Sequence, residues 1–159
     1  MQQLLAAQYE EIKGARGALL DYCKTISEAD LQKRVPEFND NTVLRLMGHC
    51  ANTYVHWLTQ LDKSSDMPFF DSISIKNIAE IQDIFKQIDQ IVADFLERYR
   101  ADYTKSMTET LPRYTEQITV TPLQLFTHTI THEFHHKGQI LTISRLLGYT
   151  PADTDVIRF

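Results

Sequence analysis

Apolar residues recur at intervals of three and four positions along four long stretches of this chain. The spacing matches the period of an amphipathic helix, and it predicts helices over residues 2–25, 41–62, 76–106 and 121–148. No part of the chain is rich in strand signals. The pattern therefore predicts an all-α fold in which the four helices pack as a four-helix bundle.

The segments between the predicted helices carry turn signals. Residues 27–30, with the sequence SEAD, resemble a capping box and predict one short helical turn. The linker 63–75 is long enough to allow a connection other than a tight hairpin, and we expect Phe69 and Phe70 to pack against the bundle. Residues 107–120 include Leu111-Pro112 and end in a β-prone run, which predicts an extended crossing into the last helix.

The last helix has clear start and stop signals. Thr121 suits the N-cap, Pro122 suits the first helical position because its missing N–H costs nothing there, and Gln124 completes a capping box. Gly148 suits the left-handed position that ends a helix, and Pro151 prevents the helix from resuming.

Three histidines of this helix, His128, His132 and His136, follow one another at intervals of four residues and so share one stripe. We expect the stripe to face the protein interior, because most of its other members are apolar. These other members are Leu125, Gln139, Ile143 and Leu146. His135 lies at the edge of the stripe.

Two histidines four residues apart on a helix, such as His132 and His136, can offer two imidazole nitrogens to one metal ion. Burying several imidazoles without partners would cost on the order of 1–3 kcal/mol each, whereas a metal ion uses their lone pairs together. The spacing therefore predicts a metal site. On the second predicted helix, His49 and His56 lie on the polar side; His56 fits a solvated face, and spacing alone leaves the role of His49 open.

Composition and charge narrow the class of protein. A chain of 159 residues with 43% hydrophobic and 23% charged residues predicts one domain over residues 1–159. A net charge of −5 argues against nucleic acid or an anionic membrane as a partner. No apolar run is long enough to span a membrane, and the amino terminus does not read as a signal peptide, so we expect a cytoplasmic protein. Cys23 and Cys50 form no CxxC pair.

Several motifs resemble those of the DinB/YfiT-like family of small helical-bundle metal proteins. Residues 128–139 resemble the family's HxxxHxxHHRGQ helix, with Lys137 in place of the usual Arg. His49, with Trp57 eight residues later, resembles the family's earlier histidine segment, and residues 147–155 resemble its LGxxPxDxD tail. The resemblance covers nearly the whole chain in helix order.

The resemblance implies a ligand set, a fold and an activity. It implies that His49, His132 and His136 bind a divalent metal ion, with zinc as the first expectation and nickel as an alternative. It also implies an up-down-down-up bundle, often dimeric. The thiol-dependent members transfer groups to a low-molecular-weight thiol or isomerise substrates with it, which by analogy predicts a thiol-dependent transferase or isomerase that acts on a small electrophile.

The analogy suggests that a bound metal ion lowers the pKa of the thiol, so that no nucleophile from the protein is required. Arg45, Asn52 and His56 are then candidates for orienting a polar substrate, or else surface residues. Whether His128 or His56 joins the metal site stays open. A metal-binding module without turnover, for stress response or interaction, is an alternative to the enzyme.

Residues 132–136 also match HExxH, the zincin pattern in which Glu133 would act as general base. Zincins need a further His or Glu ligand downstream, and no His or Glu follows His136. We therefore do not expect peptidase activity. Metal-dependent hydrolysis of another kind, with Glu133 as the base, remains as an alternative.

A second apolar stripe lies on the back of the histidine helix, formed by Leu123, Ile130, Phe134 and Leu141. Lys137 and Arg145 flank this back stripe, which fits the polar rim of an interface better than deep burial. We therefore expect a homodimer through this face. The alternative is that the carboxy-terminal residues 156–159 fold back and cover it.

Overall fold

The computed structural model describes residues 1–61, 63–110 and 115–158 and contains four long helices. Their bounds are α1 (Gln2–Cys23), α3 (Val43–Val55, extended by a π-helical turn, His56–Gln60), α4 (Ile78–Arg98) and α5 (Pro122–Leu146). Short helical turns, α2 (Glu28–Leu31) and Pro36–Phe38, connect α1 to α3. The fold is an all-α bundle, as the apolar pattern predicts. In the described ranges, no helix is long and apolar enough to cross a membrane.

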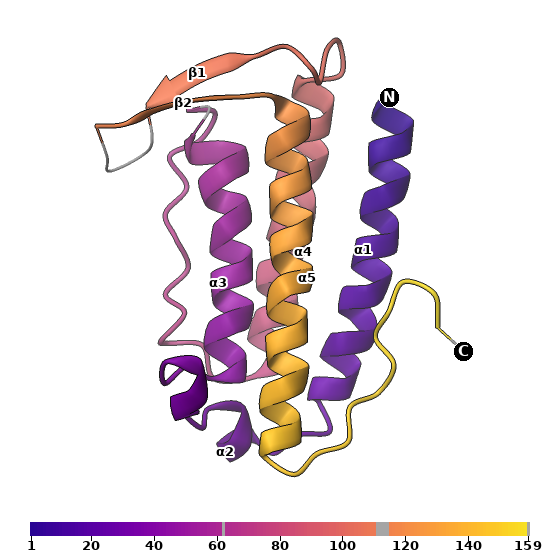
Figure 1. Ribbon diagram of the computed structural model, residues 1–159, viewed down its shortest axis with the longest axis vertical. Coiled ribbons are helices and arrows are strands. Elements are labelled where there is room, and N and C mark those ends of the chain that lie inside the picture. Colours follow the sequence, from indigo (N-terminus) through magenta and orange to yellow (C-terminus); the bar gives the residue numbers. More distant parts are fainter. Residues whose placement is uncertain (62, 111–114, 159) are drawn as a thin grey trace.

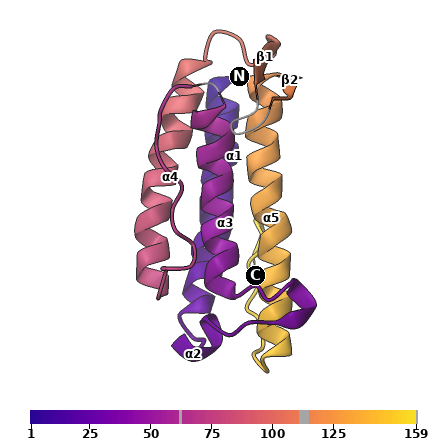
Figure 2. The ribbon, with the colours of Figure 1, turned by 90° about the vertical axis from the view of Figure 1, so that its left-hand side faces the viewer.

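The long helices stand side by side, and α3 packs against both α4 and α5 (Figures 1 and 2). α1 and α5 run in one direction, and α3 and α4 run in the other (Figure 1). The two middle helices can be parallel because the linker between them returns along the whole length of α3 before α4 begins (Figure 2).

Side chains of α3 hold this linker in place. Asn52 both donates to the carbonyl of Phe70 (2.9 Å) and accepts from its N–H (2.8 Å), and Gln60 donates to the carbonyl of Met67 (2.9 Å). Phe69 and Phe70 are partly buried against the core, which confirms the predicted packing. The side-chain amide of Asn52, a candidate for orienting substrate, is therefore bound to the backbone of the linker.

Two predicted elements differ from the structure. α4 ends at Arg98 rather than at 106, because Asp102 accepts the backbone N–H groups of Thr104 and Lys105 and folds the chain into a turn. The segment predicted as an extended crossing is instead an antiparallel hairpin of β1 (Met107–Thr110) and β2 (Gln117–Val120).

The physical reason for the hairpin is cross-strand pairing, which a search for helical periodicity does not detect. The hydroxyls of Thr108 and Thr119 lie 2.9 Å apart across the two strands. Half-buried and exposed residues alternate along both strands, so one face lies against the bundle. Leu111-Pro112, the last residue of the predicted second helix at 62, and Phe159 lie outside the described residues.

The signals that bound the last helix have the predicted roles. Thr121 and Gln124 form a reciprocal capping box, with Pro122 in the first turn. Gly148 follows the helix with a φ of 92°, a backbone conformation that suits glycine. Two members of the predicted inward stripe do not face the interior: His128 is exposed, and Leu146, the last residue of α5, is 57% exposed.

Lys137 is buried, at 7% exposure, and this contradicts its predicted place on an exposed rim. Its ammonium group donates to the carbonyl of Thr154 (2.8 Å) and to the Asp155 carboxylate (3.2 Å), and it lies 4.2 Å from the ring centroid of Phe134. The carboxy-terminal tail therefore turns back after α5, contacts it at Lys137, and rises beside the lower part of α1 (Figure 1). The back stripe is also partly covered within the chain: Ile130 is 4% exposed, and Leu123, Phe134 and Leu141 are partly buried against the core.

Candidate metal centre

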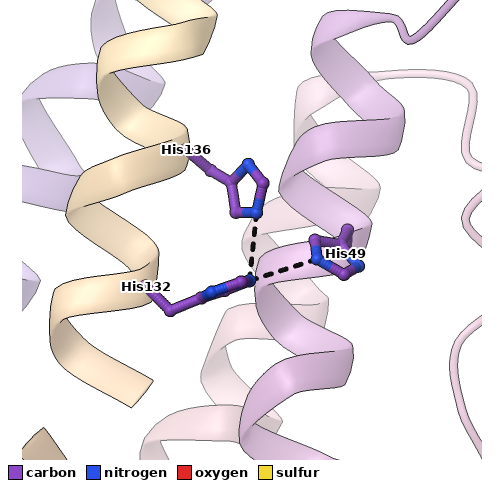
Figure 3. Close-up of side chains that lie close together, drawn as sticks. All are labelled: His49, His132 and His136. Atoms are coloured by element: carbon purple, nitrogen blue, oxygen red, sulfur yellow. Dashed lines mark hydrogen bonds between the residues drawn. The ribbon is translucent and has the colours of Figure 1, made fainter. Parts of the chain in front are cut away.

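Two helices bring three histidine side chains together. His49 projects from α3 toward His132 and His136 on α5 (Figure 3). The Nε2 atom of His132 lies 3.1 Å from Nε2 of His49 and 3.0 Å from Nε2 of His136. One ligand atom from each of the three residues lies within 4.8 Å of the others. α3 and α5 run in opposite directions, and their packing brings together His49 and His132, which are 83 positions apart in the sequence.

The ring of His136 has a defined tautomer. Its Nδ1 lies 2.7 Å from Oε1 of Gln139, a carbonyl oxygen that can only accept, so Nδ1 carries the proton. In the neutral ring, Nε2 then presents a lone pair toward His132. The amide nitrogen of Gln139 lies 3.1 Å from Nε2 of His135 and donates to it, which fixes the orientation of the amide. Sequence reasoning placed Gln139 in the stripe but missed this role.

The three imidazoles fit a divalent cation. Metal–nitrogen bonds of about 2.0–2.1 Å in tetrahedral geometry place two ligand nitrogens roughly 3.3 Å apart. The two Nε2 separations of 3.0 and 3.1 Å are close to this value. A proton on His132 Nε2 can point well at only one of its two neighbours, whereas a cation attracts all three lone pairs at once. The donor set therefore suits a metal ion.

Burial keeps these rings neutral. It lowers the pKa of His49 and of His136, although the hydrogen bond that His136 donates to Gln139 acts in the opposite direction on the pKa of His136. Burial, with the adjacent imidazoles, lowers the pKa of His132 to about 4. At neutral pH the nitrogens are therefore available to a metal ion without losing a proton first.

The other two histidines considered for the site lie beside it. His128 is exposed and stacks against the ring of His132, with centroids 5.6 Å apart, and its other neighbour is Trp57 at 5.0 Å. His56 is half-buried against Trp57, with centroids 4.7 Å apart. Neither belongs to the described group of convergent ligand atoms.

An open cavity of about 590 Å³ lies against the centre. His49 and His136 form part of its wall, together with Arg45 and Gln139. The volume is in the range of small-molecule sites in proteins. A molecule in this cavity would lie next to two of the three candidate metal ligands.

Glu133 points away from the centre into the core, where it is 6% exposed. Arg16 of α1 binds both of its oxygens, with Nε to Oε1 at 2.8 Å and Nη2 to Oε2 at 3.1 Å, and Tyr54 of α3 donates to Oε2 at 2.7 Å. Asp89 of α4 accepts from Arg16 at 2.8 Å and from Tyr9 at 2.9 Å. All four long helices contribute to this network.

Sequence reasoning missed this buried network, although one signal was available. Glu133 lies about 100° around the helix from His132, so its charged side chain lies off the histidine face. The sequence pattern offered no partner for this charge. Its partner is Arg16, which lies on the first predicted amphipathic helix. Only the packing of α1 against α5 brings the two together.

The fold and site define a class of protein, an all-α bundle with three convergent histidines on its second and last long helices. The chain belongs to the DinB family, whose model matches residues 1–159, the whole chain. No curated protein sequence matches it.

Proposed function

We propose that this protein is a metal-dependent enzyme of the thiol-dependent S-transferase or isomerase type, which acts on a small electrophilic molecule. The observation that carries the proposal is the convergence of three histidines beside a cavity of about 590 Å³. Three protein ligands leave a coordination position for water or substrate, as in catalytic rather than closed structural sites. The family resemblance supports the type of reaction.

A divalent ion at this centre, zinc first and nickel second, would supply positive charge that lowers the pKa of a small thiol. Residues of the chain itself orient the histidine ligands and keep them neutral. Gln139 holds the ring of His136 with its Nε2 lone pair inward, and burial keeps His132 neutral. In S-transfer the thiol sulfur forms a bond to the electrophilic carbon while the bond from that carbon to its leaving group breaks. The leaving group, such as halide, departs with the electron pair, and the thiol proton passes to water.

The two cysteines of the chain do not supply the nucleophile. Both are free and buried. Burial raises the pKa of Cys23 to about 12 and raises that of Cys50 as well, so both thiols stay protonated at neutral pH. The sulfur is therefore proposed to come from a small molecule. Free thiols also support the proposed cytoplasmic location, where such groups stay reduced.

The hydrolase alternative receives no support from the geometry. A general base must reach a water molecule at the metal centre, and the carboxylate of Glu133 is instead bound by Arg16 and Tyr54 in the core. The HExxH match is therefore a coincidence of spacing: the two histidines face the centre and the glutamate faces the core.

Zinc titration of protein purified without a nickel column tests the metal site. We expect one zinc ion per chain, and at least tenfold weaker binding in His49→Ala, His132→Ala and His136→Ala. His56→Ala is the matched control and should bind zinc like the wild type. Full zinc occupancy in a double variant lacking His132 and His136 would overturn the assignment.

Turnover needs a separate measurement. The zinc-loaded protein is mixed with cysteine or 3-mercaptopropionate and an alkyl halide, and thioether formation is followed against the same reaction without protein. We expect faster thioether formation that His132→Ala abolishes. Zinc binding without any acceleration would favour the non-catalytic metal-binding module.

A further inference from the structure

The cavity beside the candidate metal centre is lined by a cationic side chain that forms no ion pair within the described part of the chain. Arg45 is half-buried and lines this cavity of about 590 Å³. Thr42 caps its backbone N–H, but within the described ranges its guanidinium has no hydrogen-bond or ion-pair partner. In contrast, Arg16 uses its side-chain donors on Glu133, Asp89 and Tyr9. The donors of Arg45 are available to a ligand.

Arg45 is also well placed relative to the centre. It precedes His49 by one helical turn of α3, so the two side chains share a face and are about 6 Å apart along the axis. Both residues line the same cavity. A small molecule with one end at the histidines can therefore place its other end at the guanidinium.

The charges in the cavity favour a carboxylate over a phosphate. A guanidinium offers two parallel N–H donors that match the two oxygens of a carboxylate. Glu37 also lines the cavity, and its negative charge disfavours a second negative charge on the ligand. Arg34 is not among the residues that line this cavity; it lines a smaller adjoining one of about 160 Å³, to which Arg45 also contributes. One cation opposed by one anion suits a monoanion.

We propose that Arg45 is the specificity-determining residue of this site, and that it selects substrates bearing a carboxylate about one helical turn from the group bound at the histidines. The inference rests on the proposed function of the same site, because it assigns the substrate class of that enzyme. The apolar part of such a substrate would lie against Ile73, which is 73% exposed at the cavity wall.

Two probes that differ only in charge test the proposal without using a thiol. Imidazole-4-acetate and its neutral amide, imidazole-4-acetamide, are titrated calorimetrically into the protein, with and without one equivalent of Zn²⁺. We expect the wild type to bind the carboxylate at least tenfold more tightly than the amide. Arg45→Gln should reduce this preference to less than twofold, and Arg45→Lys should retain part of it because the charge remains.

Two controls locate the effect in the cavity. Glu37→Gln removes the like charge and should increase the preference for the carboxylate two- to threefold, whereas Arg145→Gln removes an exposed positive charge from α5 and should leave it unchanged. Equal binding of the two probes by the wild type, or a preference that Arg45→Gln retains, would overturn the inference. Zinc affinity, measured in parallel, should not change in these variants, so a failure of the metal site would be seen separately.

Discussion

At the scale of single residues, the centre depends on a contact that sets which nitrogen of His136 is free. Gln139 accepts the Nδ1–H of His136 and donates to His135, so one amide orients two rings. Such supporting contacts raise metal affinity because they remove the freedom of the ligand to rotate or change tautomer.

This role predicts an effect of Gln139 on zinc binding. Gln139→Leu should weaken zinc binding about tenfold, because His136 loses the acceptor that holds its proton on Nδ1. Gln139→Glu keeps an acceptor at this position and should bind zinc at least as well as the wild type. Competition with a zinc indicator measures both, and equal affinity of the leucine variant would show that packing alone orients His136.

The low pKa of His132 predicts a pH dependence of stability in the metal-free protein. Below pH 6.5 the unfolded chain takes up a proton at His132, whereas the folded protein does so only near pH 4. The unfolded state therefore binds more protons in this window, and stability falls as the pH is lowered from 6.5 to 4.

The expected loss is on the order of 1 kcal/mol by pH 4.5, after allowance for solvent screening of a partly exposed ring. Urea unfolding of the wild type and of His132→Asn at pH 7 and 4.5 measures it. The variant should lose less stability than the wild type, and an identical loss in both would assign the effect to other groups.

At the scale of elements, one buried polar network joins the four long helices. Arg16 on α1, Tyr54 on α3, Asp89 on α4 and Glu133 on α5 are linked by hydrogen bonds of 2.7 to 3.1 Å. Removing one partner of a buried ion pair leaves the other charge uncompensated. The resulting loss of stability is larger than the net stability that the intact pair contributes.

Glu133→Ala should therefore lower the free energy of unfolding by about 3–5 kcal/mol, because among the described residues Arg16 then keeps Asp89 alone as a counterion. Glu133→Gln retains an acceptor and should cost less. Urea unfolding gives both values, and casein hydrolysis should be absent throughout. Zinc-dependent cleavage that Glu133→Gln abolishes without a loss of stability would contradict the structural role.

The linker packs closely against α3 at Gly48. A Cβ atom there would lie 2.8 Å from Cβ and 3.2 Å from Cα of Ser72, and 2.9 Å from Cδ1 of Ile75. Gly48→Ala should therefore destabilise the protein by about 1–3 kcal/mol, because the linker must shift. At Gly138 of α5 a Cβ meets nothing within 4 Å, so Gly138→Ala should be neutral or stabilise by up to about 1 kcal/mol. Thermal unfolding of the two alanine variants makes the comparison, and equal effects would show that the linker is not tightly packed.

At the scale of the whole molecule, the packing of the back of α5 bears on assembly. The tail contacts Lys137, and Leu123, Phe134 and Leu141 are partly buried against the core. These contacts cover much of the face from which sequence reasoning expected a homodimer. We nevertheless propose the homodimer, on the family resemblance and on the exposed apolar side chains of the tail, such as Ile157 at 76% exposure.

Light scattering at micromolar concentration should give about twice the chain mass of 18.5 kDa. Phe134→Glu should give monomers that still bind zinc, because the back stripe faces away from the histidines. A monomeric wild type would mean that the tail and the core suffice to cover this face.

The sequence by itself determined the helices, the limits of the last one and the i, i+4 pair of His132 and His136. These properties depend on neighbours along the chain, such as the capping box at Thr121 and the glycine at Gly148, so local patterns predict them. The place of His49 in the set came from the resemblance, since spacing on its own helix left its role open.

Only the tertiary structure decided how distant residues meet. The 3.1 Å approach of His49 to His132, the ion pair of Arg16 with Glu133 and the contact of Lys137 with the tail all join residues on different segments. β1 and β2 likewise pair across two segments. Helical periodicity indicates which side of a single helix is apolar. The packing of whole helices determines which side chains from different helices come into contact.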